Sequence, residues 1–279
     1  MTRIKFSITN KIIIATIFSI LLFSISPNAQ EVRKISYNKV NVDVVIDKPS
    51  NDSVDVLIAY PGTVMSDDKI LDAAKFILTK VKEITNRKDI MIVSVAYPQE
   101  NRLMGDSLRE AEAALLWVKE KAAEELGKKI KKIYLVGHSQ GGYVVTRLNT
   151  MHATDGVIAN APGPLNLVFR CGLEENNRVP NGVVCGLLKE TYGTTLAKPA
   201  SYMERSLLNF TEGYKSDILF VQGLQDTRIQ MASWSTFKQK VTDCTNCKKR
   251  QFVEIANSGH PTLFSNSEAK KAYNDFINR

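Results

Sequence analysis

Residues 131 to 143 read K-K-I-Y-L-V-G-H-S-Q-G-G-Y, a short apolar run that ends in a glycine-rich turn. The run KKIYLVG (131–137) predicts a buried strand, and QGGYVVTRLN (140–149) predicts a helix. Between them, residues 137–141 have the form G-x-S-x-G. A serine on a sharp strand-to-helix turn requires very small residues two positions to either side, and its hydroxyl then projects above the sheet. This context favours a nucleophilic serine at Ser139 over an ordinary turn.

Strand and helix patterns alternate on both sides of this turn. Such alternation is typical of a parallel sheet that is covered by helices on both faces. We predict an opening pair of strands within 32–47, further strands at 54–60, 90–97, 131–137, 155–162, 217–223 and 251–256, and helices at 67–84, 107–126, 140–149, 229–241 and 267–278. The predicted fold class is α/β, with a doubly wound, mostly parallel sheet.

Residues 163 to 215 interrupt the alternation. This stretch contains several Asn, Gly and Pro residues, together with Cys171, Cys185 and a weak helical pattern near 200–210. Open α/β sheets bind their ligands at the carboxyl ends of the strands, and the stretch begins just after a predicted strand. We therefore predict one domain over residues 31–279, with a cap-like insertion at 163–215.

A serine hydroxyl is a weak nucleophile until a base takes its proton and a carboxylate orients that base. The chain has three histidines. His138 lies inside the turn and is expected to point away from Ser139 and pack against neighbouring strands. His152 ends the following helix, where a cation is favoured by the helix dipole. His260 lies in N-S-G-H-P, after the last predicted strand and at the carboxyl edge of the sheet, so it is the predicted base.

Asp226 is the predicted carboxylate, because it follows the penultimate strand at the same edge of the sheet. Asp155 and Asp217 begin strands and belong to the opposite edge, and Asp243 ends a helix and should be solvated. The alternative role for Asp226 is that of N-cap of the helix that follows.

Hydrolysis through a serine also needs two N–H groups that stabilise the negative charge on the substrate oxygen. The first candidate is the amide of Gln140, which begins the helix after Ser139. The second is the amide of Thr63, in the loop Tyr60-Pro61-Gly62-Thr63 that follows the strand at 54–60. Gly62 permits the turn in this loop.

The N-terminus has the pattern of a secretory signal peptide at residues 1–30. A charged segment MTRIKFSITNK is followed by the apolar run IIIATIFSILLFSIS and the polar segment PNAQ, with cleavage expected near Ala29 or Gln30. The apolar run has 15 residues, fewer than the ~20 that cross a bilayer as a helix. We predict a secreted or periplasmic protein without stable membrane insertion after processing; a retained N-terminal anchor is the less favoured alternative.

Export would place the four cysteines in an oxidising compartment, where an even number indicates disulfides. Of the three pairings, we favour Cys171–Cys185 and Cys244–Cys247, since each closes a short loop within one turn-rich segment. The C-T-N-C stretch at 244–247 is also compatible with a redox motif or half of a zinc site. However, the sequence has no second C-x-x-C and no nearby His to complete four ligands.

The formal net charge is +8, from 37 Lys and Arg against 29 Asp and Glu. Three of the positive charges, Arg3, Lys5 and Lys11, lie in the predicted signal peptide. The others are scattered along amphipathic helices, a distribution typical of solvated faces. We therefore predict no nucleic-acid partner, and the sequence leaves the oligomeric state undetermined.

With the G-x-S-x-G turn, Asp226, His260 and the glycine turn at Gly62, the chain resembles the α/β-hydrolase superfamily over nearly all of residues 40–279. The resemblance implies an eight-stranded, mostly parallel sheet, a Ser-Asp-His triad and no cofactor. It matches Ser139 with the nucleophile, Asp226 with the acid and His260 with the base. It also matches Gln140 and Thr63 with the oxyanion donors, although many members have His-Gly where this chain has Pro61-Gly62.

These residues predict a serine hydrolase that cleaves the carboxylic ester of a small molecule or short acyl substrate through an acyl-enzyme. One alternative is a peptidase or aminoacyl-amide hydrolase that resembles the prolyl oligopeptidases, suggested by Gly142-Tyr143, although the chain lacks the length for their propeller domain. Another is a non-catalytic binding module with the same fold. A dehalogenase or epoxide hydrolase would need an aspartate in place of Ser139.

Overall fold

Eight strands form one sheet in the computed structural model, which describes residues 30–279. Their order is β1-β2-β4-β3-β5-β6-β7-β8, in which β2 pairs antiparallel with β1 and β4 and every other pair is parallel. The strands are β1 (Glu31–Tyr37), β2 (Val40–Asp47), β3 (Ser53–Tyr60), β4 (Ile90–Ala96), β5 (Lys129–His138), β6 (Gly156–Asn160), β7 (Ile218–Gly223) and β8 (Arg250–Ile255). The predicted fold class and the strand number implied by the resemblance are confirmed.

The predicted signal peptide lies outside the described residues, apart from Gln30. Within residues 30–279, none of the helices combines the length and the apolar character that a membrane span requires.

The central strands are buried on both faces. In β3, Val56, Ile58 and Tyr60 belong to one apolar core, and the alternate residues Leu57 and Ala59 belong to the other. Side chains alternate along a strand, so a strand between two helical layers must be apolar at nearly every position. This explains why the sequence shows continuous apolar runs here instead of an alternating pattern.

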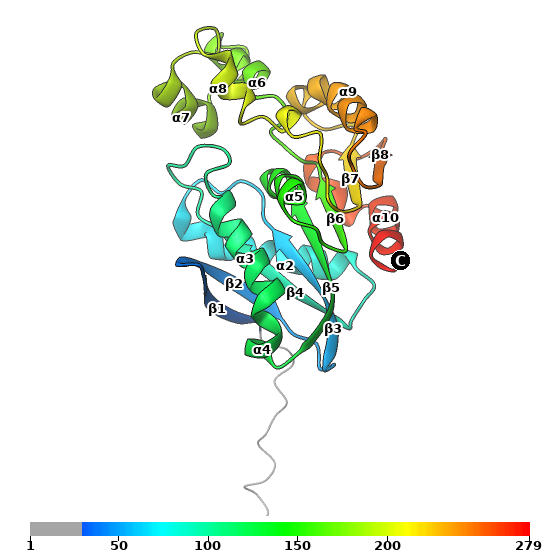
Figure 1. Cartoon of the computed structure of the whole chain (residues 1–279). Coiled ribbons are helices and arrows are strands. Elements are labelled where there is room, and N and C mark those ends of the chain that lie inside the picture. Colours follow the sequence, from blue (N-terminus) through cyan, green and yellow to red (C-terminus); the bar gives the residue numbers. More distant parts are fainter. Residues whose placement is uncertain (1–29) are drawn as a thin grey trace, which may run out of the picture.

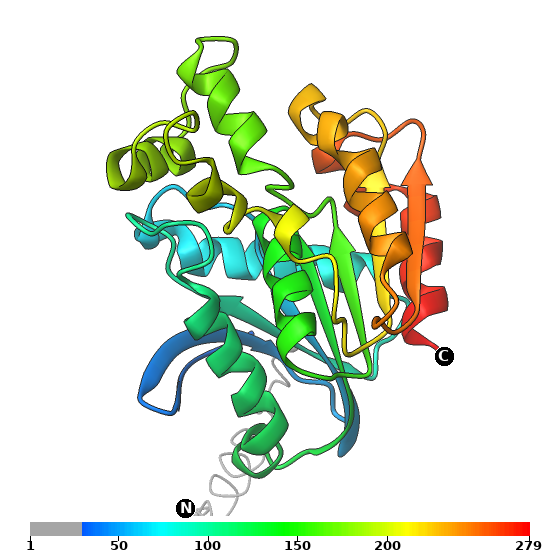
Figure 2. The same ribbon diagram turned by 45° about the horizontal axis from the view of Figure 1, so that its top comes forward.

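Helices cover both faces of the sheet (Figures 1 and 2). One face carries α2 (Ile70–Ile84) and α10 (Ser267–Ile277), and the other carries α3 (Leu108–Glu120), α5 (Gln140–Met151) and α9 (Arg228–Asp243). Short 3-10 turns occur at η2 (Asp67–Lys69) and η4 (His260–Ser265).

One predicted helix, at 107–126, is divided in the structure. Lys121 has φ −125°, outside the helical range, and separates α3 from the short α4 (Ala122–Leu126). Gly127 then ends α4 with φ 61°, a left-handed conformation that glycine adopts at low cost. The sequence around Lys121 contains no proline or glycine that would require the break.

Residues 163 to 215 contain more helix than the sequence pattern indicated. They form α6 (Leu167–Glu175), α7 (Val183–Tyr192), α8 (Pro199–Met203) and the 3-10 turn η3 (Leu207–Asn209). Figure 1 shows α6, α7 and α8 grouped together beyond the ends of the sheet strands, on the side where β5 leads into α5. We call residues 163–215 the helical insertion.

Hydrogen bonds join the helical insertion to the rest of the chain. Arg205 donates through Nη1 to the carbonyl of Met104 (2.7 Å) and to Oδ1 of Asp106 (2.8 Å), and through Nη2 to the hydroxyl of Tyr192 (3.0 Å). Arg205 therefore connects α7 and the segment after α8 to the loop that precedes α3.

Both favoured disulfides are present. Cys171 of α6 is bonded to Cys185 of α7, and Cys244 is bonded to Cys247 directly after α9. The first links two helices of the insertion. Since the second occupies both thiols of the C-T-N-C stretch, these cysteines do not form the alternative zinc half-site here.

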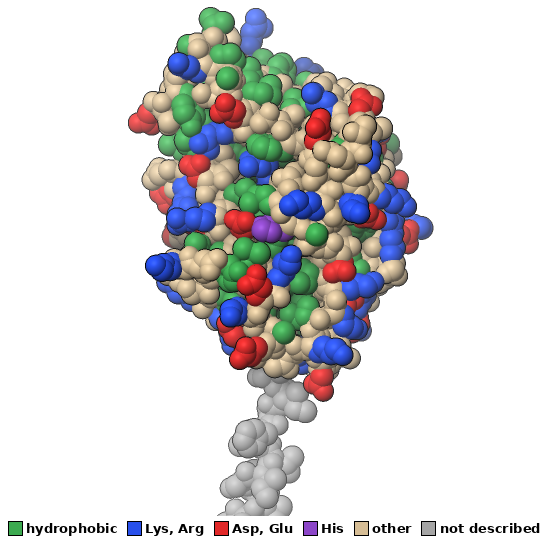
Figure 3. Space-filling model, in the orientation of Figure 1, with side chains coloured by type: hydrophobic (Ala, Val, Ile, Leu, Met, Phe, Trp, Pro, Cys, Tyr) green, Lys and Arg blue, Asp and Glu red, His purple; other side chains and the backbone are tan. Residues whose placement is uncertain are grey.

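Charged side chains of both signs are intermixed over the face shown in Figure 3. Apolar side chains are also exposed on the helical insertion, where Phe169, Val183 and Leu196 are 40%, 49% and 92% exposed.

Candidate active site

Ser139 lies between the last residue of β5 and the first residue of α5. Its φ of 57° and ψ of −119° form a conformation that non-glycine residues rarely adopt. The Ser139 amide donates to the carbonyl of Asn160 (2.9 Å), and its carbonyl accepts from the amides of Tyr143 and Gly163 (3.1 Å each). The turn is therefore held by the neighbouring strand, by α5 and by the start of the helical insertion.

The two glycines of the G-x-S-x-G turn are required by close backbone contacts. A Cβ atom on Gly137 would overlap the carbonyl of Gly141, and one on Gly141 would overlap the carbonyl of Tyr60 at the end of β3. Any side chain at either position would have to displace backbone atoms. The steric reason predicted for these glycines is therefore confirmed.

His260 and Asp226 form a hydrogen-bonded pair at the carboxyl edge of the sheet. Nδ1 of His260 lies 2.8 Å from Oδ2 of Asp226, whose side chain is 1% exposed against 33% for His260. The Asp226 carboxylate also accepts from the amide of Thr227 (2.6 Å) and from Nε2 of Gln222 (3.0 Å). A carboxylate placed in this way holds the ring with its proton on Nδ1 and leaves Nε2 to act as a base.

Burial alone would favour the neutral form of Asp226. The hydrogen bond and positive charge of His260, together with the hydrogen bonds from Gln222 and Thr227, outweigh this and lower the pKa of Asp226 below its ordinary value. Asp226 is therefore charged at neutral pH. Asp226 is not the N-cap of α9, which was its alternative role. Thr227 is the N-cap, and its side chain accepts a hydrogen bond from the backbone amide of Gln230.

Ser139, Asp226 and His260 all line one cavity of about 400 Å³. Within residues 30–279, the Ser139 hydroxyl makes no hydrogen bond with His260; such bonds are often long until substrate is bound. The structure thus brings together three residues that are far apart in sequence, and it orients the histidine through the aspartate.

The other acidic candidates lie where the sequence placed them. Asp155 accepts from the amide of Ile133 and Asp217 from the amide of Lys249, both at the amino-terminal edge of the sheet. His152, at the end of α5, has its Nε2 atom 2.5 Å from Oε1 of Glu112.

His138 contacts the neighbouring strand β6, as predicted, and it has ring contacts that were not predicted. Its ring packs against the loop after β8, with ring centroids 4.7 Å from His260 and 5.2 Å from Phe264. Nδ1 of His138 lies 3.2 Å from the side-chain nitrogen Nδ2 of Asn160. Burial and the nearby charge of His260 lower the pKa of His138 to about 4, so this ring is neutral above that pH.

Replacing His138 with phenylalanine is expected to make folding less sensitive to acid. The unfolded chain takes up a proton at this histidine near pH 6.5, whereas the folded chain does so only near pH 4, so stability is lost as pH falls through this interval. We expect His138 to account for about 2 kcal/mol of the unfolding free energy that the parent protein loses between pH 7 and pH 4, allowing for partial exposure of the ring. Urea unfolding at pH 7, 5.5 and 4 measures it; equal losses in parent and His138→Phe would contradict this role.

The loop after β3 passes directly beside Ser139. A Cβ atom on Gly62 would lie 3.3 Å from Cβ of Ser139, and the hydroxyl of Thr63 donates to Oε1 of Gln140 (3.0 Å). The structure therefore brings together the two residues whose amides we predicted as oxyanion donors.

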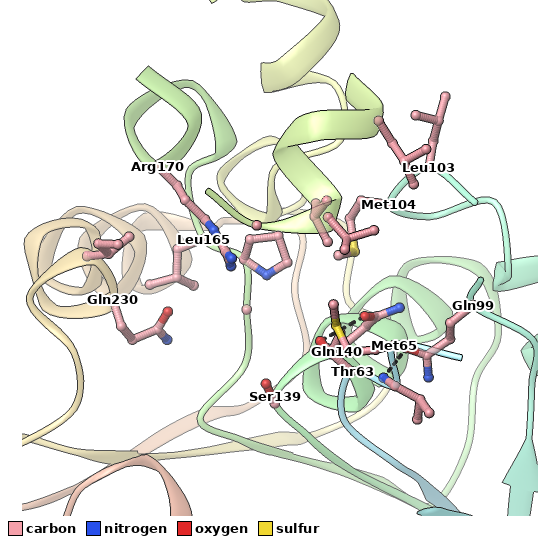
Figure 4. A pocket seen from close by; sticks show the side chains of 18 of the residues that line it. Thr63, Met65, Gln99, Leu103, Met104, Ser139, Gln140, Leu165, Arg170 and Gln230 are labelled. Carbon is pink, nitrogen blue, oxygen red and sulfur yellow. Dashed lines mark hydrogen bonds between the residues drawn. The ribbon is translucent and has the colours of Figure 1, made fainter. Parts of the chain in front are cut away.

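Gln99 holds this loop from the other side. Its Oε1 accepts from the amide of Val64 (2.8 Å) and its Nε2 donates to the carbonyl of Gly62 (3.1 Å), so it bonds the backbone on both sides of Thr63. Figure 4 shows Thr63, Gln140 and Gln99 together on one wall of the cavity. The side chain of Tyr97 adds a hydrogen bond to the carbonyl of Pro61 (2.6 Å).

Solved structures share this arrangement of strands and helices. The chain is similar to the acylaminoacyl peptidase of Pyrococcus horikoshii, with a TM-score of 0.65 and 15% identity over 95% of this chain and 43% of that one. It is also similar to an esterase of Pyrococcus furiosus (TM-score 0.64, 16% identity, 90% of this chain and 91% of that one) and to one of Pyrobaculum calidifontis (0.65, 14%, 90% and 83%). The chain has the α/β-hydrolase fold.

At identities of 14–16%, this similarity shows the fold alone. The fold does not identify the reaction, because many chemistries occur on the α/β-hydrolase fold. The chain spans less than half the length of the peptidase. Neither a model of a protein family nor a curated protein sequence matches it.

Two residues that hold the site in place, Gln99 and Gln222, were not predicted from the sequence. Gln99 follows β4, and Gln222 lies near the end of β7, fully buried and bonded to Asp226. Gln222 is a polar residue within the apolar run DILFVQG, and a buried polar side chain requires a partner. That signal could have identified Gln222, whereas an isolated glutamine after a strand, such as Gln99, carries no comparable signal.

Proposed function

We propose that the protein is a serine hydrolase that cleaves carboxylic esters of small molecules through an acyl-enzyme. The observation that carries this proposal is the His260–Asp226 pair, 2.8 Å apart and lining the same cavity as Ser139. A binding module would have no need of an oriented histidine beside a serine in a rare backbone conformation.

In the proposed reaction, Oγ of Ser139 attacks the ester carbonyl while Nε2 of His260 accepts its proton. The buried charge of Asp226 stabilises the imidazolium that forms. The amides of Gln140 and Thr63 donate to the negatively charged oxygen of the tetrahedral intermediate. His260 then gives the proton to the leaving alcohol, and water repeats the cycle to release the acid.

We propose secretion or periplasmic export through removal of residues 1–30. The pattern of that segment and the two disulfides support this location, because disulfides persist in oxidising compartments.

Labelling with a fluorophosphonate probe tests the proposed nucleophile. We expect the probe to modify the protein at the tryptic peptide that spans residues 133–147, in which Ser139 is the single serine. Modification requires an activated hydroxyl, so unfolded protein serves as the control. Folded protein that remains unlabelled, or is labelled on another peptide, would favour the binding module.

A substrate panel distinguishes ester hydrolysis from amide hydrolysis. The similarity to an acylaminoacyl peptidase makes amide hydrolysis the second candidate. We expect turnover of 4-nitrophenyl esters and none of the corresponding 4-nitroanilides. Turnover of anilides and peptides alone would replace esterase with peptidase while leaving the nucleophile in place.

A further inference from the structure

Arg170 places a cation in the cavity that contains Ser139. It lies on α6 of the helical insertion, and Figure 4 shows its side chain extending from the helix toward Leu165 and the interior of the cavity. Its Nε donates to Oε1 of Glu174 (3.2 Å), and the other oxygen of Glu174 accepts from the amide of Gly182 (2.7 Å). The Glu174 side chain is only 5% exposed, so its position is fixed, and its bond to Nε orients the guanidinium of Arg170.

The two terminal nitrogens of Arg170 have no acceptor among the residues that the structure describes. With Nε bonded to Glu174, the end-on pair Nη1 and Nη2 stays available, and this pair matches the two oxygens of a carboxylate. The second arginine of the cavity, Arg102, instead uses the terminal nitrogen Nη1 to bond Glu110 (2.9 Å).

The carboxylates of the same cavity are already engaged. Asp226 is bonded to His260, and Oε2 of Glu100 accepts from the amide of Asp67 (3.0 Å). Much of the remaining wall is apolar and includes Met65, Leu103, Met104, Leu165, Leu187 and Ile229. An apolar cavity into which Arg170 presents its terminal pair of nitrogens fits a ligand that has an apolar body and an anionic end.

The position of Arg170 is fixed before any ligand binds. The next residue, Cys171, is bonded to Cys185 of α7, and the side chain of Asn166 caps α6 by accepting from the amide of Phe169 (3.0 Å). Binding therefore needs little ordering of this helix, which lowers the entropic cost of recognition.

We propose that Arg170 binds a carboxylate of the substrate, so that the substrate class is an anionic ester that carries a free carboxylate in its acyl or alcohol part. This inference rests on the proposed serine hydrolase activity and specifies its substrate.

Matched esters test this proposal. On the acyl side, mono-4-nitrophenyl glutarate is compared with 4-nitrophenyl pentanoate, which has a methyl group in place of the carboxylate. On the alcohol side, 4-acetoxybenzoate is compared with 4-methylphenyl acetate. For each pair the ratio of kcat/KM values is measured in parent, Arg170→Gln and Arg178→Gln, after subtraction of uncatalysed hydrolysis. Comparing ratios between variants cancels the intrinsic reactivities of the esters.

We expect the preference for the anionic ester in at least one pair to fall about tenfold in Arg170→Gln, as for loss of one charge-assisted interaction. Arg178 is exposed on the same insertion and does not line the cavity, so Arg178→Gln should keep the parent's ratio. If both ratios agree within about twofold between parent and Arg170→Gln, the carboxylate site is wrong and the hydrolase proposal stands. If the parent hydrolyses none of the four esters and Ser139 is not labelled, the hydrolase proposal fails and this inference fails with it.

Discussion

Replacing Ser139 or His260 with alanine is expected to lower kcat/KM for ester hydrolysis by a factor of about 10⁶, and replacing both should cost no more than either single change. The serine supplies the nucleophile and the histidine removes its proton, so each is ineffective without the other. Activity that remains would come from the oxyanion donors and from substrate binding. Initial rates with a 4-nitrophenyl ester measure all three variants.

Asp226→Asn is expected to have a smaller effect, about 10⁴-fold, because the histidine and serine remain while the wrong ring nitrogen is favoured for protonation. Ser265→Ala and His152→Ala are matched controls, since Ser265 is exposed on η4 and His152 is bonded to Glu112 at the far end of α5. Both controls should keep the parent's rate. A His260→Ala variant that retains more than about a tenth of this rate would show that another group takes the proton, and the mechanism would then be wrong.

Much of this site could be predicted because its positions follow from local rules. Gly137 and Gly141 are dictated by the sterics of one tight turn. Asp226 and His260 could be selected because parallel strands bring their carboxyl ends to one edge, which separates residues after strands from residues before them. The same rule excluded Asp155 and Asp217, and the structure places both at the opposite edge.

The environment of His138 could have been predicted from strand periodicity. Val136 and His138 are two positions apart on β5, so their side chains point to the same face of the sheet. Val136 belongs to the core that contains Phe264 of η4, and His138 contacts the ring of the same phenylalanine. The prediction that His138 packs against neighbouring strands therefore did not include its contacts with His260 and Phe264.

Other features depend on contacts that no local pattern encodes. Gln99 bonds the carbonyl of Gly62, which lies 37 positions away in sequence. The break at Lys121 lies in a segment with good helix-forming residues on both sides, so local propensity predicts a continuous helix there. The helices α6 and α7 were missed because they are short and are flanked by turns that contain Asn, Gly and Pro, and their packing is set by the disulfide and by Arg205.

Replacing Gln99 with methionine is expected to lower kcat about 100-fold, comparable to loss of one oxyanion donor, with little change in KM. Methionine has nearly the same shape but makes neither of the hydrogen bonds that fix the backbone on both sides of Thr63. The amide of Thr63 would then be poorly placed for the charge that develops on the substrate oxygen. Because that charge is greatest in the transition state, its loss affects kcat more than ground-state binding.

Gln239→Met is the matched control, since Gln239 is exposed on α9 and bonds only Asp243 among the described residues. Urea unfolding of both variants determines how much of the effect comes from lost stability. A Gln99→Met enzyme with unchanged kcat and raised KM would mean that this loop binds substrate without stabilising the oxyanion. The second donor would then be sought in a residue other than Thr63, because loss of both hydrogen bonds that Gln99 makes beside the Thr63 amide would have left the transition state unaffected.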